Sequence, residues 1–109
     1  MTVRDLQKSL SLIPVTLPEG EREVEGVYIG DLLSWVMGRA QADNVWLTIM
    51  SNFNIVAVAT LSDVSCIILC EGVTVDESVK NTAEAKGINI LGTHKTAYDM
   101  AKCLAELGL

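Results

Sequence analysis

Hydroxyl and basic side chains occur together in Thr93-His94-Lys95-Thr96. Threonine hydroxyls can donate hydrogen bonds, and His94 and Lys95 can carry positive charge, so this segment has the chemistry to hold an anion such as a phosphate. It follows a short apolar run and opens a helical pattern, at the carboxyl end of a strand, where open α/β sheets bind ligands. We therefore predict a small-anion site at Thr93, His94, Lys95 and Thr96. The alternative is a threonine-capped helix with His94 and Lys95 in solvent.

A second polar segment, Ser51-Asn52-Phe53-Asn54, also follows an expected strand. The amides of Asn52 and Asn54 can hydrogen-bond a polar ligand, and the Phe53 ring can stack on one. We predict that this loop approaches the same end of the sheet as Thr93–Thr96. A plain polar loop in which Asn54 caps the next helix is the alternative.

A third candidate is the glycine turn that leads into a helix over residues Gly26–Ser34. A helix N-terminus offers free N–H groups and a positive dipole end, which suits an anion. Asp31 stands at that N-terminus, however, and as a helix cap it would occupy the same donors. The sequence therefore favours a structural helix entry here, with the glycines needed for close packing.

The remaining reactive side chains predict neither a metal site nor a catalytic site. Cys66 and Cys70 on one strand would be about 13 Å apart at ~3.3 Å per residue, too far for one zinc ion with ~2.3 Å bonds. The three cysteines of the chain are fewer than the roughly four ligands of an iron–sulfur cluster. His94 has no evident nucleophile and acid beside it, and no GxxxxGK[ST] loop is present. We expect buried, reduced thiols and no cofactor.

Composition narrows the class of protein further. The net charge is −6 and the eight basic residues are scattered, which argues against nucleic-acid binding. The longest apolar runs are far shorter than the ~20 residues of a membrane-spanning helix. Arg4, Asp5 and Lys8 interrupt the segment where a signal peptide would be apolar, so we expect a cytoplasmic protein. Half of the residues are hydrophobic, which favours a subunit interface near Trp35, Met37 and Trp46, although each could equally be core.

Hydrophobic periodicity and turn residues predict the elements that position these groups. Pro14 supplies no N–H group, so its strand should begin there or lie at a sheet edge. We predict one domain over residues 1–109, a three-layer α/β fold with a short, mostly parallel sheet. The expected helices are Val3–Leu10, Leu32–Ala40, Ile55–Ser62, Glu77–Lys86 and Lys95–Leu107, and the expected extended segments are Ile13–Leu17, Val24–Ile29, Val45–Met50, Cys66–Leu69 and Ile88–Leu91.

Several segments in this order resemble the DRTGG domain family. The stretch that corresponds to the motif in the family's name is Glu21-Arg22-Glu23-Val24-Glu25-Gly26, which keeps the arginine and the final glycine but not the full motif. The resemblance covers nearly the whole chain. It continues in Tyr28–Ser34, Asn54–Ala59, Ile67–Gly72, Ile88–Leu91 and Leu104–Gly108.

The resemblance implies an α/β regulatory module of a kind that tends to dimerise and for which no activity of its own is established. Relatives occur beside CBS domains and in some phosphotransacetylases, and the fold is similar to the non-catalytic N-terminal domain of HPr kinase/phosphorylase. The expected function is that of a non-catalytic, homodimeric module that binds a partner protein or a small anionic ligand. Two alternatives stay open: an adenine-nucleotide sensor, and an accessory factor for hydrogenase or electron-transfer complexes, because stand-alone relatives are encoded near such genes.

Overall fold

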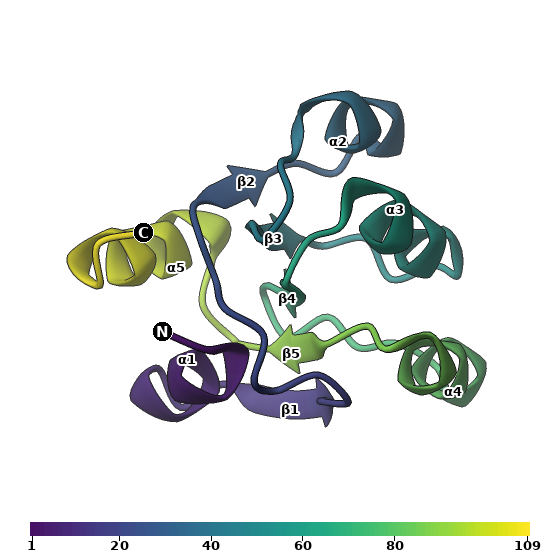
Figure 1. Ribbon diagram of the computed structural model, residues 1–109, viewed down its shortest axis with the longest axis horizontal. Coiled ribbons are helices and arrows are strands. Elements are labelled where there is room, and N and C mark those ends of the chain that lie inside the picture. The colour runs from purple at the N-terminus through teal and green to yellow at the C-terminus, as the bar shows by residue number, and fades with distance from the viewer.

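A computed structural model describes residues 1–109 and contains a five-stranded sheet flanked by helices (Figure 1). The strands are β1 (Ile13–Thr16), β2 (Val27–Ile29), β3 (Val45–Thr48), β4 (Cys66–Leu69) and β5 (Ile90–Gly92). The helices are α1 (Val3–Ser9), α2 (Leu33–Arg39), α3 (Asn54–Ser62), α4 (Glu77–Lys86) and α5 (Ala97–Glu106).

The sheet has the strand order β1-β5-β4-β3-β2. Strands β2 to β5 are parallel to their neighbours, and β1 is antiparallel to β5. The position of β1 at the edge confirms the interpretation of Pro14, whose ring removes one ladder donor. The mostly parallel α/β fold predicted from the sequence is confirmed.

Helices cover both faces of the sheet and make three layers. Helices α2, α3 and α4 pack on one face, and α1 and α5 pack on the other, as the right and left sides of Figure 1 show. Successive strand side chains point to opposite faces, so Trp46 and Ile67 join the first layer whereas Leu47 and Ile68 join the second. Both faces of β3 and β4 are buried, which explains their nearly uniform apolar composition.

Capping residues fix most helix ends where the sequence predicts them. Thr2 and Asp5 form a capping box at α1. Asp76 caps α4, and Gly87 ends it in the left-handed conformation with φ +73°. Ser78 and the Val79 N–H hydrogen-bond the Asp76 carboxylate and lower its pKa.

Two predicted boundaries near the C-terminus are shifted. Helix α5 begins at Ala97 rather than Lys95, because the Thr96 hydroxyl caps it by accepting from Asp99 N at 3.2 Å. Strand β5 begins at Ile90 rather than Ile88, because the Thr16 hydroxyl bridges Ile88 O and Ile90 N at 2.7 and 3.0 Å. This bridge accompanies the register irregularity between Pro14 and Thr16.

Two predicted caps are wrong. Asp31 does not cap α2, whose N-cap Leu32 makes no side-chain hydrogen bond. Its carboxylate instead accepts from Thr48 Oγ1 and Ile49 N at 2.8 and 2.9 Å, which ties the end of β2 to the end of β3. Asn54 does not cap α3 but is its first residue, and the Asn52 side chain accepts from Asn54 N at 2.9 Å.

No helix in the chain has the length and apolar character needed to cross a lipid bilayer.

Candidate functional site

The connections after β4 and β5 leave the sheet in opposite directions. The chain runs from β4 to α4 on one face, and from β5 to α5 on the other. Neighbouring parallel strands whose helices lie on opposite faces create a switch point, where open α/β folds place their ligands. The predicted segment Thr93–Thr96 lies at this point, directly after β5.

Hydrogen bonds hold the loops after β4 and β5 together. Glu71 N donates to Lys95 O, and Gly72 N donates to Thr93 O, each at 2.9 Å. Thr93 is buried, and its hydroxyl accepts from Lys95 N at 3.2 Å. The crevice at the switch point is therefore closed by backbone contacts, and a ligand there would lie on top of the joined loops.

His94 lies exposed against the turn after β4. Gly72 has φ +74°, and a β-carbon at this position would stand 2.9 Å from His94 Nδ1. The left-handed backbone therefore favours glycine here, and a larger residue would also require the exposed imidazole to move. Lys95 is exposed beside it, and neither residue takes part in an ion pair. A lysine and a histidine side chain are thus exposed to solvent at the switch point.

The second predicted segment does not join the first in a pocket. Asn52 and Asn54 follow β3, and β4 separates that strand from β5. Both asparagines are exposed. No cavity lies between Ser51–Asn54 and Gly92–Thr96. A binding site shared by the two loops stays a prediction.

Between α3 and α4 there is a half-open groove of about 300 Å³. It contains none of the residues predicted for the ligand site, although Phe53 of the polar loop borders it. Sequence periodicity missed this groove because it depends on how two helices pack side by side. Its lining residues are Phe53, Val56, Ala57, Thr60, Leu61, Thr82 and Lys86.

Cys70 is buried just beyond the end of β4, close to Asp31. Burial, with the negative charges of Glu71 and Asp31, raises the pKa of Cys70 to about 11. Burial also raises the pKa of Cys66, at the start of the same strand, to about 12. Both thiols are protonated near neutral pH, and a protonated thiol is neither a nucleophile nor a metal ligand. No group of three or more His, Cys, Asp or Glu side chains has a geometry suited to a metal ion.

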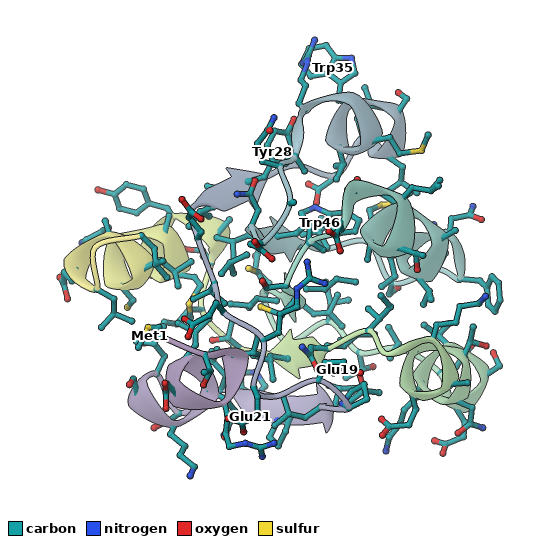
Figure 2. The ribbon with its side chains drawn as sticks, viewed as in Figure 1. Met1, Glu19, Glu21, Tyr28, Trp35 and Trp46 are labelled. Carbon is teal, nitrogen blue, oxygen red and sulfur yellow. The ribbon has the colours of Figure 1, made fainter.

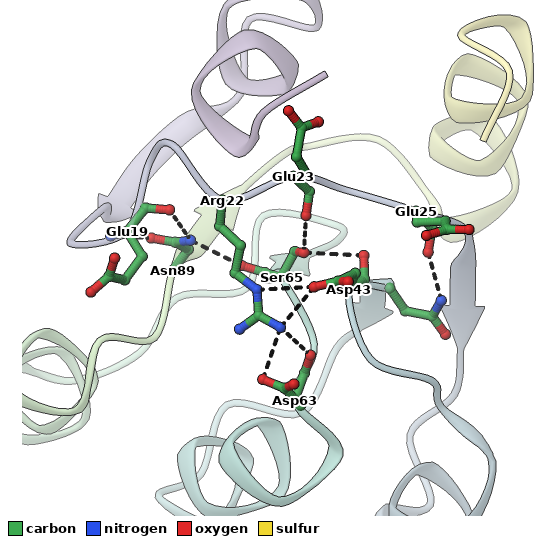
Figure 3. Close-up of polar contacts among 9 residues, drawn as sticks. Glu19, Arg22, Glu23, Glu25, Asp43, Asp63, Ser65 and Asn89 are labelled. Atoms are coloured by element: carbon green, nitrogen blue, oxygen red, sulfur yellow. Dashed lines mark hydrogen bonds and ion pairs between the residues drawn. The ribbon is translucent and has the colours of Figure 1, made fainter.

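The opposite end of the sheet holds a polar network around Arg22 (Figure 3). Its Nη2 atom lies 3.0 Å from Asp43 Oδ1 and 2.8 Å from Asp63 Oδ1, and it also donates to Asp63 O. Burial lowers the pKa of Arg22, but the hydrogen bonds and charges of the two aspartates outweigh it and raise that pKa. Both aspartates have positive φ, +68° and +57°, in the left-handed region. Arg22 therefore clamps two strained turns at the starts of β3 and β4.

Uncharged side chains complete the same network. Asn89 accepts from Glu19 N and donates to Glu19 O and Ser65 O, each at 2.9 Å. The Ser65 hydroxyl donates to Glu23 O and Asp43 O, and Asn44 Nδ2 donates to Glu25 O at 2.8 Å. The segment 19–25 is thus fastened across the amino ends of β3, β4 and β5. Sequence reasoning missed this network, although each of these strands follows a small polar residue.

The two tryptophans have different environments (Figure 2). Trp46 is fully buried, and its indole N–H donates to Gly30 O at 2.9 Å. It is a core residue, which is the second of the two positions that the sequence left open for it. Trp35 and Met37 on α2 are 53% and 51% exposed. The guanidinium of Arg39 stacks over the Trp35 ring, 3.5 Å from its centroid.

The model of the DRTGG domain matches residues 18–107. The chain belongs to the DRTGG domain family. In this DRTGG domain, the arginine of the name-giving stretch is Arg22, and its contacts are with the chain itself. No curated protein shows significant sequence similarity to it.

A solved structure supports the same fold. The chain is similar to the CBS and DRTGG domains of the regulatory region of Clostridium perfringens pyrophosphatase, crystallised with its activator diadenosine tetraphosphate. The TM-score is 0.72 at 14% sequence identity, and the match covers 93% of this chain. It spans 44% of that structure, and at this identity the likeness shows the fold alone.

Proposed function

We propose that this DRTGG domain is a non-catalytic regulatory module that works as a homodimer and binds a small anionic ligand at the carboxyl ends of β4 and β5. The observation that carries the ligand proposal is the switch from α4 on one face to α5 on the other. It brings the Thr93–Thr96 loop to the point where open α/β sheets bind ligands.

Charge supports an anion at this point. The chain has a net charge of −6, yet His94 and Lys95 are adjacent, exposed and free of acidic partners. A phosphate group resting on the joined loops would accept charge-assisted hydrogen bonds from both side chains. A small anion fits better than an acidic protein segment, because the basic side chains here are confined to two neighbouring residues, His94 and Lys95.

Adenine nucleotides are the ligand class that we propose for this position. The observation that favours them is the similar regulatory region that was crystallised with diadenosine tetraphosphate. In the present chain the phosphates would bind His94 and Lys95. The base would then extend from the loops toward Asn52 and Phe53, in the loop that follows β3.

Isothermal titration calorimetry with ATP, diadenosine tetraphosphate and inorganic phosphate tests the proposal. We expect binding that weakens with added salt, and a loss of affinity of about tenfold or more in the double variant His94→Ala/Lys95→Ala. Lys80→Ala, which removes an exposed lysine on α4, is the matched control and should bind normally. No heat change with any of the three probes at millimolar concentration, or equal binding by the double variant, would overturn the proposal.

A further inference from the structure

Helix α3 carries no charged residue along its whole length, Asn54–Ser62. Its inward side chains, including Ile55 and Ala59, are buried in the core. Its outward side has an apolar stripe at spacings of four: Phe53 at the N-cap, then Ala57, then Leu61. Phe53 is 53% exposed and Leu61 is 72% exposed. A helix that is apolar on all sides is normally covered on all sides, so α3 lacks a partner on its outer face.

The half-open groove between α3 and α4 lies beside this stripe. The hydroxyl of Thr60 donates to Val56 O at 2.8 Å, and that of Thr82 donates to Ser78 O at 2.9 Å, so both donors are satisfied within their own helices. Lys86 is the one charged residue of the lining, and it forms no ion pair. The groove therefore offers apolar surface with a free cation at its border.

We propose that the outer face of α3 and the adjoining groove bind a second copy of this chain, with the two α3 helices antiparallel across a two-fold axis at Ala57. This inference rests on the homodimer proposed above and names its face. In this arrangement Phe53 of each copy meets Leu61 of the other, because the stripe is ordered large, small, large. The small side chain of Ala57 lets the two helix backbones approach closely at the axis.

Self-complementarity favours a second copy over an unrelated partner. A two-fold interface uses the same surface on both subunits, so one face must supply both protrusions and hollows. Here Phe53 and Leu61 protrude, and Ala57 and the groove are the hollows. Two chains of net charge −6 would repel one another, but α3 brings no charge into the contact, and the free Lys86 faces an acidic second copy.

The competing face is the outer side of α2, where Trp35 and Met37 are exposed. Arg39 stacks over Trp35 and places a charged group above its ring. Burying that surface would also bury the guanidinium, which costs free energy unless an acidic group pairs with it. Helix α3 itself carries no charged group, and Lys86 stands at the border of the groove on α4, so we place the axis at α3.

Sedimentation velocity over a range of protein concentrations tests this assignment. We expect the wild-type chain to be a dimer, and Ala57→Glu to weaken association by about 100-fold or more, because two carboxylates would face each other at the axis. Ala85→Glu, on an exposed position of α4 outside the groove, is the matched control and should remain dimeric. Circular dichroism verifies that both variants keep their helices.

A cross-linking experiment gives a positive signal that misfolding cannot imitate. In a Cys103→Ser background, Ala57→Cys should form a disulfide-linked dimer, because facing helices about 8 Å apart bring their Cα atoms within disulfide range. Ala85→Cys should not form one. If Ala57→Glu stays dimeric while Trp35→Ala dissociates, the α3 face is wrong and the homodimer stands. If the wild-type chain is monomeric at every concentration, both the α3 interface and the proposed homodimer are wrong.

Discussion

The amino and carboxyl ends of the parallel strands use polar residues differently. Before β3, β4 and β5, the side chains of Asn44, Ser65 and Asn89 are buried, and each is hydrogen-bonded to the crossing segment 19–25. After β3 and β5, Asn52 and His94 are exposed, and the imidazole of His94 forms no hydrogen bond or ion pair within the chain. At the amino end these side chains are hydrogen-bonded within the chain, and at the carboxyl end they are exposed to solvent.

This difference separates the structural signature of the family from its candidate ligand site. Arg22, the arginine of the name-giving stretch, is held by Asp43 and Asp63 through its Nε and Nη2 atoms. The exposed side chains of His94 and Lys95 lie at the other end of the strands. Substitutions at the amino end should therefore reduce stability, whereas substitutions at the carboxyl end should change binding.

The largest effect is expected from Asn89→Ala. The change removes the partner that the buried Asn89 gives to Glu19 N and Ser65 O and leaves Glu19 O with only Arg22 N, which we expect to cost about 3 kcal/mol of unfolding free energy. Asn52→Ala at the carboxyl end removes one exposed bond and should cost about 1 kcal/mol or less. Urea denaturation of both variants measures the contrast, and equal losses would remove the distinction between the two ends.

Arg22→Ala should give the next largest effect. It breaks two ion pairs and frees two aspartates held at positive φ, and we expect a loss of about 2 kcal/mol after allowing for solvent screening. Arg39→Ala, which removes only the exposed stacking on Trp35, should cost roughly 0.5–1 kcal/mol. Thermal denaturation in low and high salt measures both losses. If Arg22→Ala loses no more stability than Arg39→Ala, Arg22 does not clamp the two turns.

The two buried cysteines should give stability a pH dependence, which we expect to be a smaller effect than the two losses above. Cys66 lies at the amino end of β4, and Cys70 lies just beyond its carboxyl end. The folded pKa values of Cys66 and Cys70, about 12 and 11, lie above the ordinary value of 9.0. The unfolded thiols lose their protons near pH 9 while the folded thiols stay protonated, so this stability is complete below pH 9. It declines as pH rises from 9 toward 11 for Cys70 and toward 12 for Cys66. Urea midpoints at pH 7, 9 and 10.5 follow the decline.

Thiol labelling distinguishes the two positions directly. We expect Cys103, which is only partly buried, to react first with a thiol reagent, then Cys70, and Cys66 last. Mass spectrometry of partly labelled protein gives the order. Labelling of Cys66 before Cys70 would mean that the amino end opens more readily than the carboxyl end.

The smallest effect on stability is expected from His94→Ala and Lys95→Ala. Both side chains are exposed and free of ion pairs, so each change should stay within about 0.5 kcal/mol. A larger loss in urea denaturation would indicate a structural role for this loop and would align it with the amino end.

Local signals in the sequence were sufficient for much of the fold. The threonine at α1, the aspartate and glycine that bound α4, and the proline at β1 act over a few residues, and each is where the pattern predicts it. Asp31 shows where this reasoning fails: its neighbours indicate a helix cap, but its partners Thr48 and Ile49 come from the next strand. A distant partner that competes with a local one is not visible in a short window.

The site was less predictable for the same reason. The position of Thr93–Thr96 after a strand could be read from the sequence, but the closure of the loops by Glu71 and Gly72 depends on strand order. The network around Arg22 joins residues 41 positions apart, and the apolar groove depends on helix packing. These features arise only when the elements assemble.

Strand β5 lies between β1 and β4, and this has a consequence for biosynthesis. The ribosome makes β1 early, but β5, the only strand that pairs with β1, is made near the end of the chain. In the same way, Asn89 is made 70 residues after its partner Glu19. At about 5–20 residues per second, β1 waits for several seconds or longer with an unpaired edge. The nascent chain can build the β2–β4 units first, and it reaches its final form only when β5 inserts between the two halves.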